Sequence, residues 1–323
     1  MTSHQPVLNQ HDGTPNGVPG EKQKTHADLS KLADPLPRLW RGDKEGKITY
    51  PSIPTFEDKY EEREWMKGHL AAAFRYWGKL GFNEVGIAGH ITLRDCVKPD
   101  HFWSVCLPYR LLVGVTEMGL IQDESLRKTL LDDNDLVLVD AEGRPTPEGA
   151  QLPINTAGFY IHSAIHKARP DVVAAAHCHS FYGKSWSVFG RPIDILQQDS
   201  CAFVDNLSVY NSYGGVVLAA EEGENIAKAL GPTNKSCILR NHGLLTLGNT
   251  IDECIYLFAL LEKTCQMQLM VEAAAANGIP KVCIDDDDAK YNAATQKDPA
   301  VLYAHFQSEY ELLVKETNGD FLQ

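Results

Sequence analysis

One short stretch, Val172-Val-Ala-Ala-Ala-His177-Cys-His179, decides the expected fold and chemistry of this chain. Its five consecutive apolar residues predict a buried strand. Alternate side chains of a strand point to the same face, so both histidines share one face at the strand end. A His-x-His pair in this position suits bidentate binding of a metal ion. It leaves further positions for a third ligand and for substrate.

A third histidine follows another apolar strand. The stretch Ser236-Cys-Ile-Leu-Arg-Asn-His242-Gly predicts a strand that runs into a glycine turn. If the two strand ends are neighbours, His242 completes a three-imidazole site with an open position, which is typical of a catalytic metal. The competing interpretation is that these histidines are ordinary hydrogen-bonded residues. His162 and His166, four apart on a predicted helix, are either a second ligand pair or hydrogen-bonding groups of the helix layer, and we favour the latter.

The remaining pattern predicts an α/β or α+β protein in which one sheet is covered by helices. Helices are expected at about 56–81, 155–168, 222–230, 250–276 and 300–316. Strands are expected at about 90–95, 102–107, 135–140, 172–179, 192–197, 236–242 and 244–247. Thr250-Ile-Asp-Glu253 has the pattern of a capping box, which begins the longest helix.

Three segments follow from the composition along the chain. Residues 1–33 are rich in Gly, Pro, His, Gln, Asn and Thr, and they predict a disordered tail because they hold too little apolar surface to offset ordering. Residues 34–280 form the expected main domain. Residues 281–323 contain the acidic run Asp285–Asp288, expected to be solvated, and a last helix.

The overall composition excludes several classes of function. The chain has 323 residues, 43% of them hydrophobic, and 43 acidic against 30 basic residues give a net charge of −13. This charge does not suit nonspecific binding to nucleic acid or to an anionic membrane. No stretch approaches the roughly 20 apolar residues of a membrane-spanning helix. The eight cysteines form no CxxC pair, so we expect reduced thiols and a cytoplasmic location.

Three motifs together resemble the class II aldolase/adducin family. They are Asn155-Thr-Ala-Gly-Phe-Tyr-Ile-His162 with its continuation to Asp171, the pair His177-Cys-His179, and Leu239-Arg-Asn-His242-Gly-Leu. The resemblance covers about residues 65–272. It implies an α/β/α sandwich around a mainly antiparallel sheet. It also implies cyclic homotetramers with active sites between subunits. The implied cofactor is a divalent metal, usually Zn²⁺ with Fe²⁺ or Mn²⁺ as alternatives, held by the residues that match His177, His179 and His242.

Two departures separate this chain from the sugar-phosphate aldolases of that family. Those enzymes have a catalytic Glu four residues before the histidine that matches His162, and this chain has Gly158 there, as the adducin-like branch does. Their phosphate-binding Gly-Asn-x-Ser turn corresponds to Gly89-His-Ile-Thr92, and their Ser-Ser pair is missing around Ile154-Asn155. These differences argue against a sugar phosphate as substrate. The candidate substrate-binding residues are Gly89, Thr92 and Arg94.

The leading hypothesis is a metal-dependent lyase. A small hydroxy- or oxo-carboxylate would bind the ion, which would stabilise the enolate left by decarboxylation or retro-aldol cleavage. Decarboxylation needs a proton donor after CO₂ leaves rather than a strong base before cleavage. Without a Glu at position 158, the candidate proton-transfer residues are Asp199, His90 and Tyr210. Each also has a structural interpretation, as a turn, cap or packing residue.

Two alternatives stay open. One is a non-catalytic, adducin-like interaction module, which the three histidines and the acidic charge argue against. The other is an Fe(II)-dependent oxygenase on the same three-histidine site, because imidazole suits iron as well as zinc. The expected partner is a small molecule rather than nucleic acid or a membrane.

Overall fold

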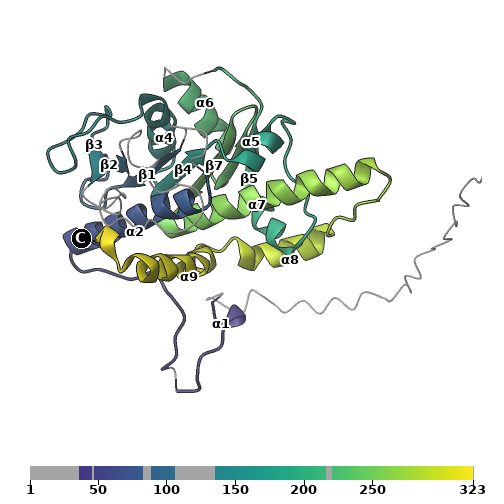
Figure 1. Cartoon of the computed structure of the whole chain (residues 1–323), viewed down its shortest axis with the longest axis horizontal. Helices are drawn as coiled ribbons and strands as arrows, with labels where there is room; N and C mark the ends of the chain where they lie inside the picture. The colour runs from purple at the N-terminus through teal and green to yellow at the C-terminus, as the bar shows by residue number, and fades with distance from the viewer. Residues whose placement is uncertain (1–35, 46, 83–88, 106–134, 216–219, 323) are drawn as a thin grey trace, which may run out of the picture. The chain divides into compact units, whose positions relative to one another are not determined.

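The computed structural model describes residues 36–45, 47–82, 89–105, 135–215 and 220–322. These residues belong to one compact unit. They form a seven-stranded sheet with helices on both faces, as Figure 1 shows. The α/β/α sandwich expected from the sequence is therefore confirmed.

The sheet has the order β3-β2-β1-β4-β7-β6-β5. The strands are β1 His90–Arg94, β2 Phe102–Val105, β3 Leu136–Val139, β4 Ala174–Cys178, β5 Leu207–Tyr210, β6 Ser236–Leu239 and β7 Gly243–Gly248. All neighbours are antiparallel except the edge pair of β5 and β6. The predicted His-x-His strand, β4, lies at the centre of the sheet, where its short alanine side chains let helices approach closely on both sides.

Helices α4, Thr156–Ala168, and α6, Ala220–Leu230, cover one face. Asn155 caps α4 by accepting hydrogen bonds from the backbone N–H groups of Ala157 and Gly158, which satisfies two of its free donors. Apolar side chains of the two helices pack on alternate residues of β4, β6 and β7. Ala175 belongs to this layer, so His177, two residues on, points toward α4 as well.

The opposite face is covered by α2, Lys59–Lys79, and α7, Ile251–Ala276, with the short helix α5, Phe181–Ser187, beside α7. The side chain of Thr250 caps α7 at the predicted position. Helix α9, Pro299–Thr317, packs outside α2 and α7 (Figure 1). The short 3-10 helix η5, Asp320–Leu322, follows it. The segment from 281 onward, set apart in the sequence, thus belongs to the same compact unit.

Several sequence predictions need correction. Residues 192–197 form no strand: Ile195 O accepts a hydrogen bond from the Ile284 N–H, and the Asp194 N–H donates to Gln268 Oε1, both outside any strand ladder. The acidic run begins a helix, α8, Asp286–Gln296, because Asp285 caps it and acidic residues in a first turn favour the helix dipole. Strand β5, helix α5, the 3-10 helix η4, Gln198–Phe203, and the short helix α1, Leu36–Leu39, were not predicted. The whole predicted tail, 1–33, lies outside the described residues.

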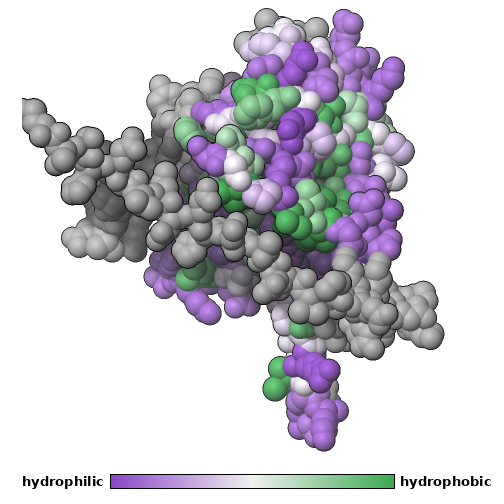
Figure 2. Space-filling view, turned by 90° about the vertical axis from the view of Figure 1, so that its right-hand side faces the viewer, coloured by the Kyte–Doolittle hydropathy of each residue, from purple (hydrophilic) through white to green (hydrophobic). Residues whose placement is uncertain are grey.

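The surface and the cysteines add two further facts. In the described part of the chain, no helix is both long and apolar enough to cross a membrane. Figure 2 shows a face on which apolar patches alternate with hydrophilic side chains. The described cysteines are all free, and five of them are buried.

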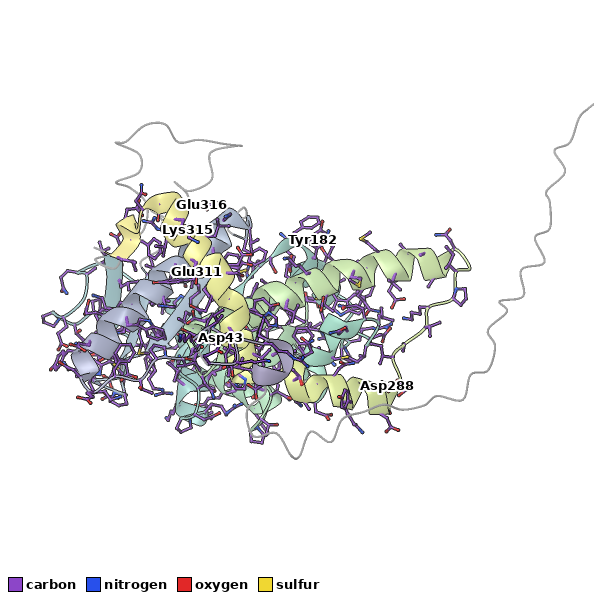
Figure 3. The ribbon with its side chains drawn as sticks, turned by 90° about the horizontal axis from the view of Figure 1, so that it is seen from below. Asp43, Tyr182, Asp288, Glu311, Lys315 and Glu316 are labelled. Carbon is purple, nitrogen blue, oxygen red and sulfur yellow. The ribbon has the colours of Figure 1, made fainter. Side chains whose placement is uncertain are left out.

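A buried carboxylate connects the three outer helices. Asp252 of α7 is fully buried, and its Oδ1 accepts hydrogen bonds from His69 Nδ1 of α2 at 2.7 Å and from Gln307 Nε2 of α9 at 2.8 Å. A second pair, Lys79 and Glu316 at 2.9 Å, joins α2 to α9 at the surface. Figure 3 shows Glu316 near the end of α9, following Glu311 and Lys315 along the helix.

We expect Asp252→Ala to lower the free energy of unfolding by about 3 kcal/mol, because two buried donors lose their acceptor. Lys79→Ala is the matched control and should cost less than about 1 kcal/mol, because Lys79 and its partner Glu316 are both exposed to solvent. Urea denaturation followed by circular dichroism measures both values. Equal losses for the two variants would contradict this assignment of the buried link.

Candidate metal centre and the histidines around it

The structure brings the three predicted imidazoles together. His177 is in β4, His179 follows that strand, and His242 is in the turn between β6 and β7. Because β4 pairs with β7, opposing His177 to Leu245, the turn lies beside the end of β4. One donor atom from each of the three histidines lies within 4.8 Å of the others. The ring centroids are 4.6 to 5.2 Å apart.

The turn that carries His242 has a demanding backbone. Asn241 has a φ of 59°, a left-handed conformation that asparagine tolerates better than most residues. At Gly243, an added Cβ would lie 2.6 Å from the carbonyl oxygen of Cys178. A glycine is therefore needed for the turn to approach β4 closely enough to bring His242 to His177.

The protonation states of the cluster suit a metal. Burial, followed by the neighbouring imidazoles, holds the pKa of His177 well below its usual range, and the same causes lower the pKa of His242 to about 4. Burial also lowers the pKa of His179. Nδ1 of His177 donates to the carbonyl oxygen of Leu244 at 2.8 Å, which leaves the Nε2 lone pair free. Three neutral imidazoles with converging donors fit a divalent cation.

A buried carboxylate on α7 holds the N-terminus of α5, which directly follows His179. Glu262 accepts hydrogen bonds from Ser180 Oγ at 2.5 Å, from the Tyr182 N–H at 2.8 Å and from the Gly183 N–H at 2.6 Å. Tyr182 lies beside α7 in Figure 3. Burial raises the pKa of Glu262, and the hydrogen bond from Ser180 partly offsets this. Sequence analysis missed Glu262, whose only signal was an acidic residue within the apolar helix α7.

His90 lies next to the cluster on the neighbouring strand. It opposes His177 directly in the pairing of β1 with β4, so both side chains point to the same face. Its ring is buried, burial lowers its pKa to about 4, and neither ring nitrogen has a hydrogen-bond partner among the described residues. A Cβ on Gly158 would lie 2.6 Å from His90 Cγ. The imidazole of His90 therefore occupies the space that a side chain at position 158 would need.

His162 and His166 take part in the hydrogen bonding of the helix layer, the interpretation favoured from the sequence. Both contact the hydroxyl of Thr92, through His162 Nδ1 at 2.8 Å and His166 Nε2 at 2.9 Å. His162 also lies edge-on to His90, with ring centroids 4.6 Å apart. Thr92, a candidate substrate-binding residue in the sequence, is thus a buried link between two histidines.

Other predicted site residues lie elsewhere. Arg94 donates to the carbonyl oxygens of Val172, Pro99 and His166 at 2.7 to 3.1 Å, so its guanidinium binds backbone and leaves no free fork for a carboxylate. Gly89 faces Trp77 and the Cβ of Cys178, on the opposite side of the sheet from His177.

Two of the three candidate proton-transfer residues also lie away from the three-histidine cluster. Tyr210 donates its hydroxyl to Glu222 Oε2 at 2.8 Å and packs with the α4 and α6 layer. Asp199 lies exposed on η4, where its charge acts on Tyr256 of α7 and His305 of α9. Within the described chain, only His90 of the three candidates lies beside the cluster.

The buried histidines predict a loss of stability in acid. His90, His162, His166, His177 and His242 are neutral in the fold and protonate near pH 6.5 when unfolded, so the unfolded chain binds more protons between pH 6.5 and about 4. The free energy of unfolding of the metal-free protein should therefore fall with pH in this window. Each histidine contributes up to about 1.4 kcal/mol per pH unit.

Urea titrations across this window measure the slope, and His166→Gln should reduce it because the pKa of His166 is lowered to about 3 by burial. An unchanged slope in this variant would show that His166 is not held neutral in the fold.

Gly158→Ala should force His90 out of its position, since three atoms of the ring lie within 2.9 Å of the added Cβ. We expect a loss of about 1–3 kcal/mol in the free energy of unfolding, typical of overpacking. Gly78→Ala, at a helical glycine with open space around it, is the control and should not destabilise. In the His90→Ala background, Gly158→Ala should cost little. A full cost there would mean that His90 is not the obstacle.

Comparison with known proteins agrees with the fold. Residues 68–269 match the family described as Class II Aldolase and Adducin N-terminal domain. The Meiotically up-regulated gene 14 protein of Schizosaccharomyces pombe is 36% identical over 85% of this chain and 98% of its own length. Two Streptomyces relatives are each 37% identical. They are the 4-hydroxy-3-prenylphenylpyruvate oxygenase/4-hydroxy-3-prenylbenzoate synthase of S. roseochromogenus subsp. oscitans, over 70% of this chain and 76% of its own, and Decarboxylase NovR of S. niveus, over 68% and 75%.

Among solved structures, the L-fuculose 1-phosphate aldolase from Glaciozyma antarctica PI12 superposes with a TM-score of 0.71. It is 34% identical to this chain and covers 83% of it and 96% of its own length. The sequence motifs, the sheet order and these matches agree: this chain belongs to the class II aldolase and adducin family.

Proposed function

We propose that the protein is a divalent-metal-dependent lyase that cleaves a C–C bond of a small hydroxy- or oxo-carboxylate, with decarboxylation preferred. The observation that carries this proposal is the convergence of His177, His179 and His242 at one end of the sheet. His177 is buried, whereas His179 and His242 are only partly buried, so a substrate can reach the site from their side. The names of the two Streptomyces relatives, one a decarboxylase and the other naming a phenylpyruvate, support an oxo acid as substrate.

The three histidines would hold the ion through neutral imidazole nitrogens. A bound divalent cation supplies Lewis-acid stabilisation of the negative charge that develops on a substrate oxygen as the C–C bond breaks. We propose Zn²⁺, because an all-imidazole donor set suits it well. The N-terminus of α5, anchored by Glu262, would keep the neighbouring His179 in place, and the hydrogen bond from His177 to Leu244 would leave His177 Nε2 free to bind the ion.

His90 is the proposed proton-transfer residue. It opposes His177 in the sheet, and neither of its buried ring nitrogens has a hydrogen-bond partner among the described residues, so both keep their hydrogen-bonding capacity for a substrate. A carboxylate bound next to His90 would raise its pKa, because a nearby negative charge favours the imidazolium form. This would let the ring deliver a proton to the carbon from which CO₂ leaves.

The site also suits assembly between subunits. Phe181, which follows the ligand loop, is 63% exposed, and Tyr213, whose ring centroid lies 6.4 Å from that of His242, is 56% exposed. Large apolar side chains exposed beside a site are typical of an interface, and we propose a homotetramer that covers them. The free, mostly buried cysteines are typical of a reducing compartment, and we propose the cytoplasm.

An Fe(II)-dependent oxygenase is the second candidate, favoured by the name of the first Streptomyces relative. Imidazole ligands suit Fe²⁺ as well as Zn²⁺, so the donor set does not separate the two. Incubation with hydroxy- and oxo-carboxylates, followed for CO₂ or aldehyde, tests the lyase. Oxygen uptake with added Fe²⁺ tests the oxygenase. Inactivity in both assays, at full metal occupancy, would favour a non-catalytic adducin-like module.

The double variant His177→Ala/His179→Ala should lose the metal and keep the fold. We expect fewer than about 0.1 ions per chain by elemental analysis, against about one ion in the unmodified protein, because one remaining imidazole does not hold the cation. The circular dichroism spectrum should stay unchanged, as expected for a catalytic site. His305→Gln, on α9 away from the cluster, should keep the ion. Unfolding of the double variant would instead identify a structural metal.

A further inference from the structure

A buried threonine fixes how two histidines share their protons. Thr92, His162 and His166 are all buried, and the Thr92 hydroxyl oxygen lies 2.8 Å from His162 Nδ1 and 2.9 Å from His166 Nε2. A hydroxyl has one proton to donate, so it can donate to only one of these nitrogens and must accept from the other. The two rings are therefore held in opposite roles toward Thr92.

Arg94 sets the direction of the hydrogen bonds that run from His166 through Thr92 to His162. Its Nη2 donates to the carbonyl oxygen of His166 at 2.7 Å and lies 3.4 Å from His166 Nδ1. Because a guanidinium only donates, it favours a lone pair on Nδ1 and a proton on Nε2 of His166. That Nε2–H then donates to Thr92, the Thr92 hydroxyl donates to His162 Nδ1, and the proton of His162 resides on Nε2.

This leaves a directed donor without an acceptor. His162 Nε2 is buried and has no hydrogen-bond partner among the described residues, and neither has either ring nitrogen of His90. The two rings are in edge-to-face contact, and His90 opposes His177. An unsatisfied buried N–H costs about 1–3 kcal/mol, so three unpartnered nitrogens beside one another point to a further group that the described residues do not supply.

We propose that His162 and His90 together bind an anionic oxygen of the substrate, a carboxylate or enolate oxygen, beside the three-histidine cluster. His162 supplies a fixed Nε2–H donor, and Thr92, His166 and Arg94 are positioning residues that act through it. The inference rests on the proposed function for the identity of the ligand. Donors held in place before the reaction stabilise developing negative charge without a cost of reorganisation.

The first test is the proton position. ¹⁵N-imidazole NMR of the full chain, metal-free and zinc-loaded at neutral pH, should show His162 and His166 each as a single Nε2–H tautomer, with His162 Nδ1 shifted as a hydrogen-bond acceptor. Thr92→Val should move the His162 Nδ1 signal to its unbonded position, and Thr92→Ser should restore it. Thr246→Val is the control, because that buried hydroxyl donates to Cys254 O in the α7 layer. A proton on His162 Nδ1 in the unmodified protein would overturn the proposal.

The second test is binding of oxalate, a small dianion, to the zinc-loaded protein by calorimetry. We expect His162→Phe to weaken binding about tenfold, the loss of one hydrogen bond to a charged group, while zinc content stays unchanged. Thr92→Val should weaken binding less, and should add nothing in the His162→Phe background because Thr92 acts through His162. Unchanged oxalate affinity in His162→Phe would overturn the role of His162 as a ligand-binding residue.

The two tests separate this inference from the proposed function. If the unmodified chain binds no divalent metal ion, the lyase proposal fails, while NMR of the metal-free protein still tests the tautomer. If zinc and oxalate bind with normal affinity but His162 makes no difference, the inference fails and the lyase proposal stands.

Discussion

The pairing of β4 with its two antiparallel neighbours is the constraint on which the candidate site depends. Its pairing with β7 places the His242 turn beside the end of β4, and its pairing with β1 places His90 opposite His177. Because side chains alternate along strands, a one-residue shift in either register would move one partner to the other face of the sheet. Hydrogen bonds between backbones thus decide which imidazoles meet.

Small residues make this close arrangement possible. Gly243 lets the turn approach the backbone at Cys178, and Gly158 leaves space for the ring of His90. Bulk at either position would separate imidazoles that now lie in contact. At this end of the sheet, aromatic rings therefore pack directly against the backbone of glycines. A single added methyl group at either glycine would clash with its neighbour.

Burial of so many imidazoles has an electrostatic consequence. The low dielectric and the neighbouring rings keep them neutral, which preserves lone pairs for a cation and directed N–H groups for an anion. Neighbouring side chains orient the rings: Glu262 from α7 holds the N-terminus of α5 next to His179, and Thr92 from β1 joins two rings of α4. A cation beside neutral donors is an arrangement suited to binding a negatively charged oxygen.

The sequence by itself determined the fold class, most of the helices and strands, and the three histidines of the cluster. These depend on local periodicity, on caps such as Asn155 and Thr250, and on short motifs that can be identified without knowing which residues lie nearby in space. Only the tertiary structure decided that Arg94 binds carbonyl oxygens, that Asp199 and Tyr210 lie away from the cluster, and that His90 fills the space at Gly158. The reason is physical: such roles depend on which residues meet across the sheet, and one strand's pattern states which face a side chain occupies but not what it contacts there.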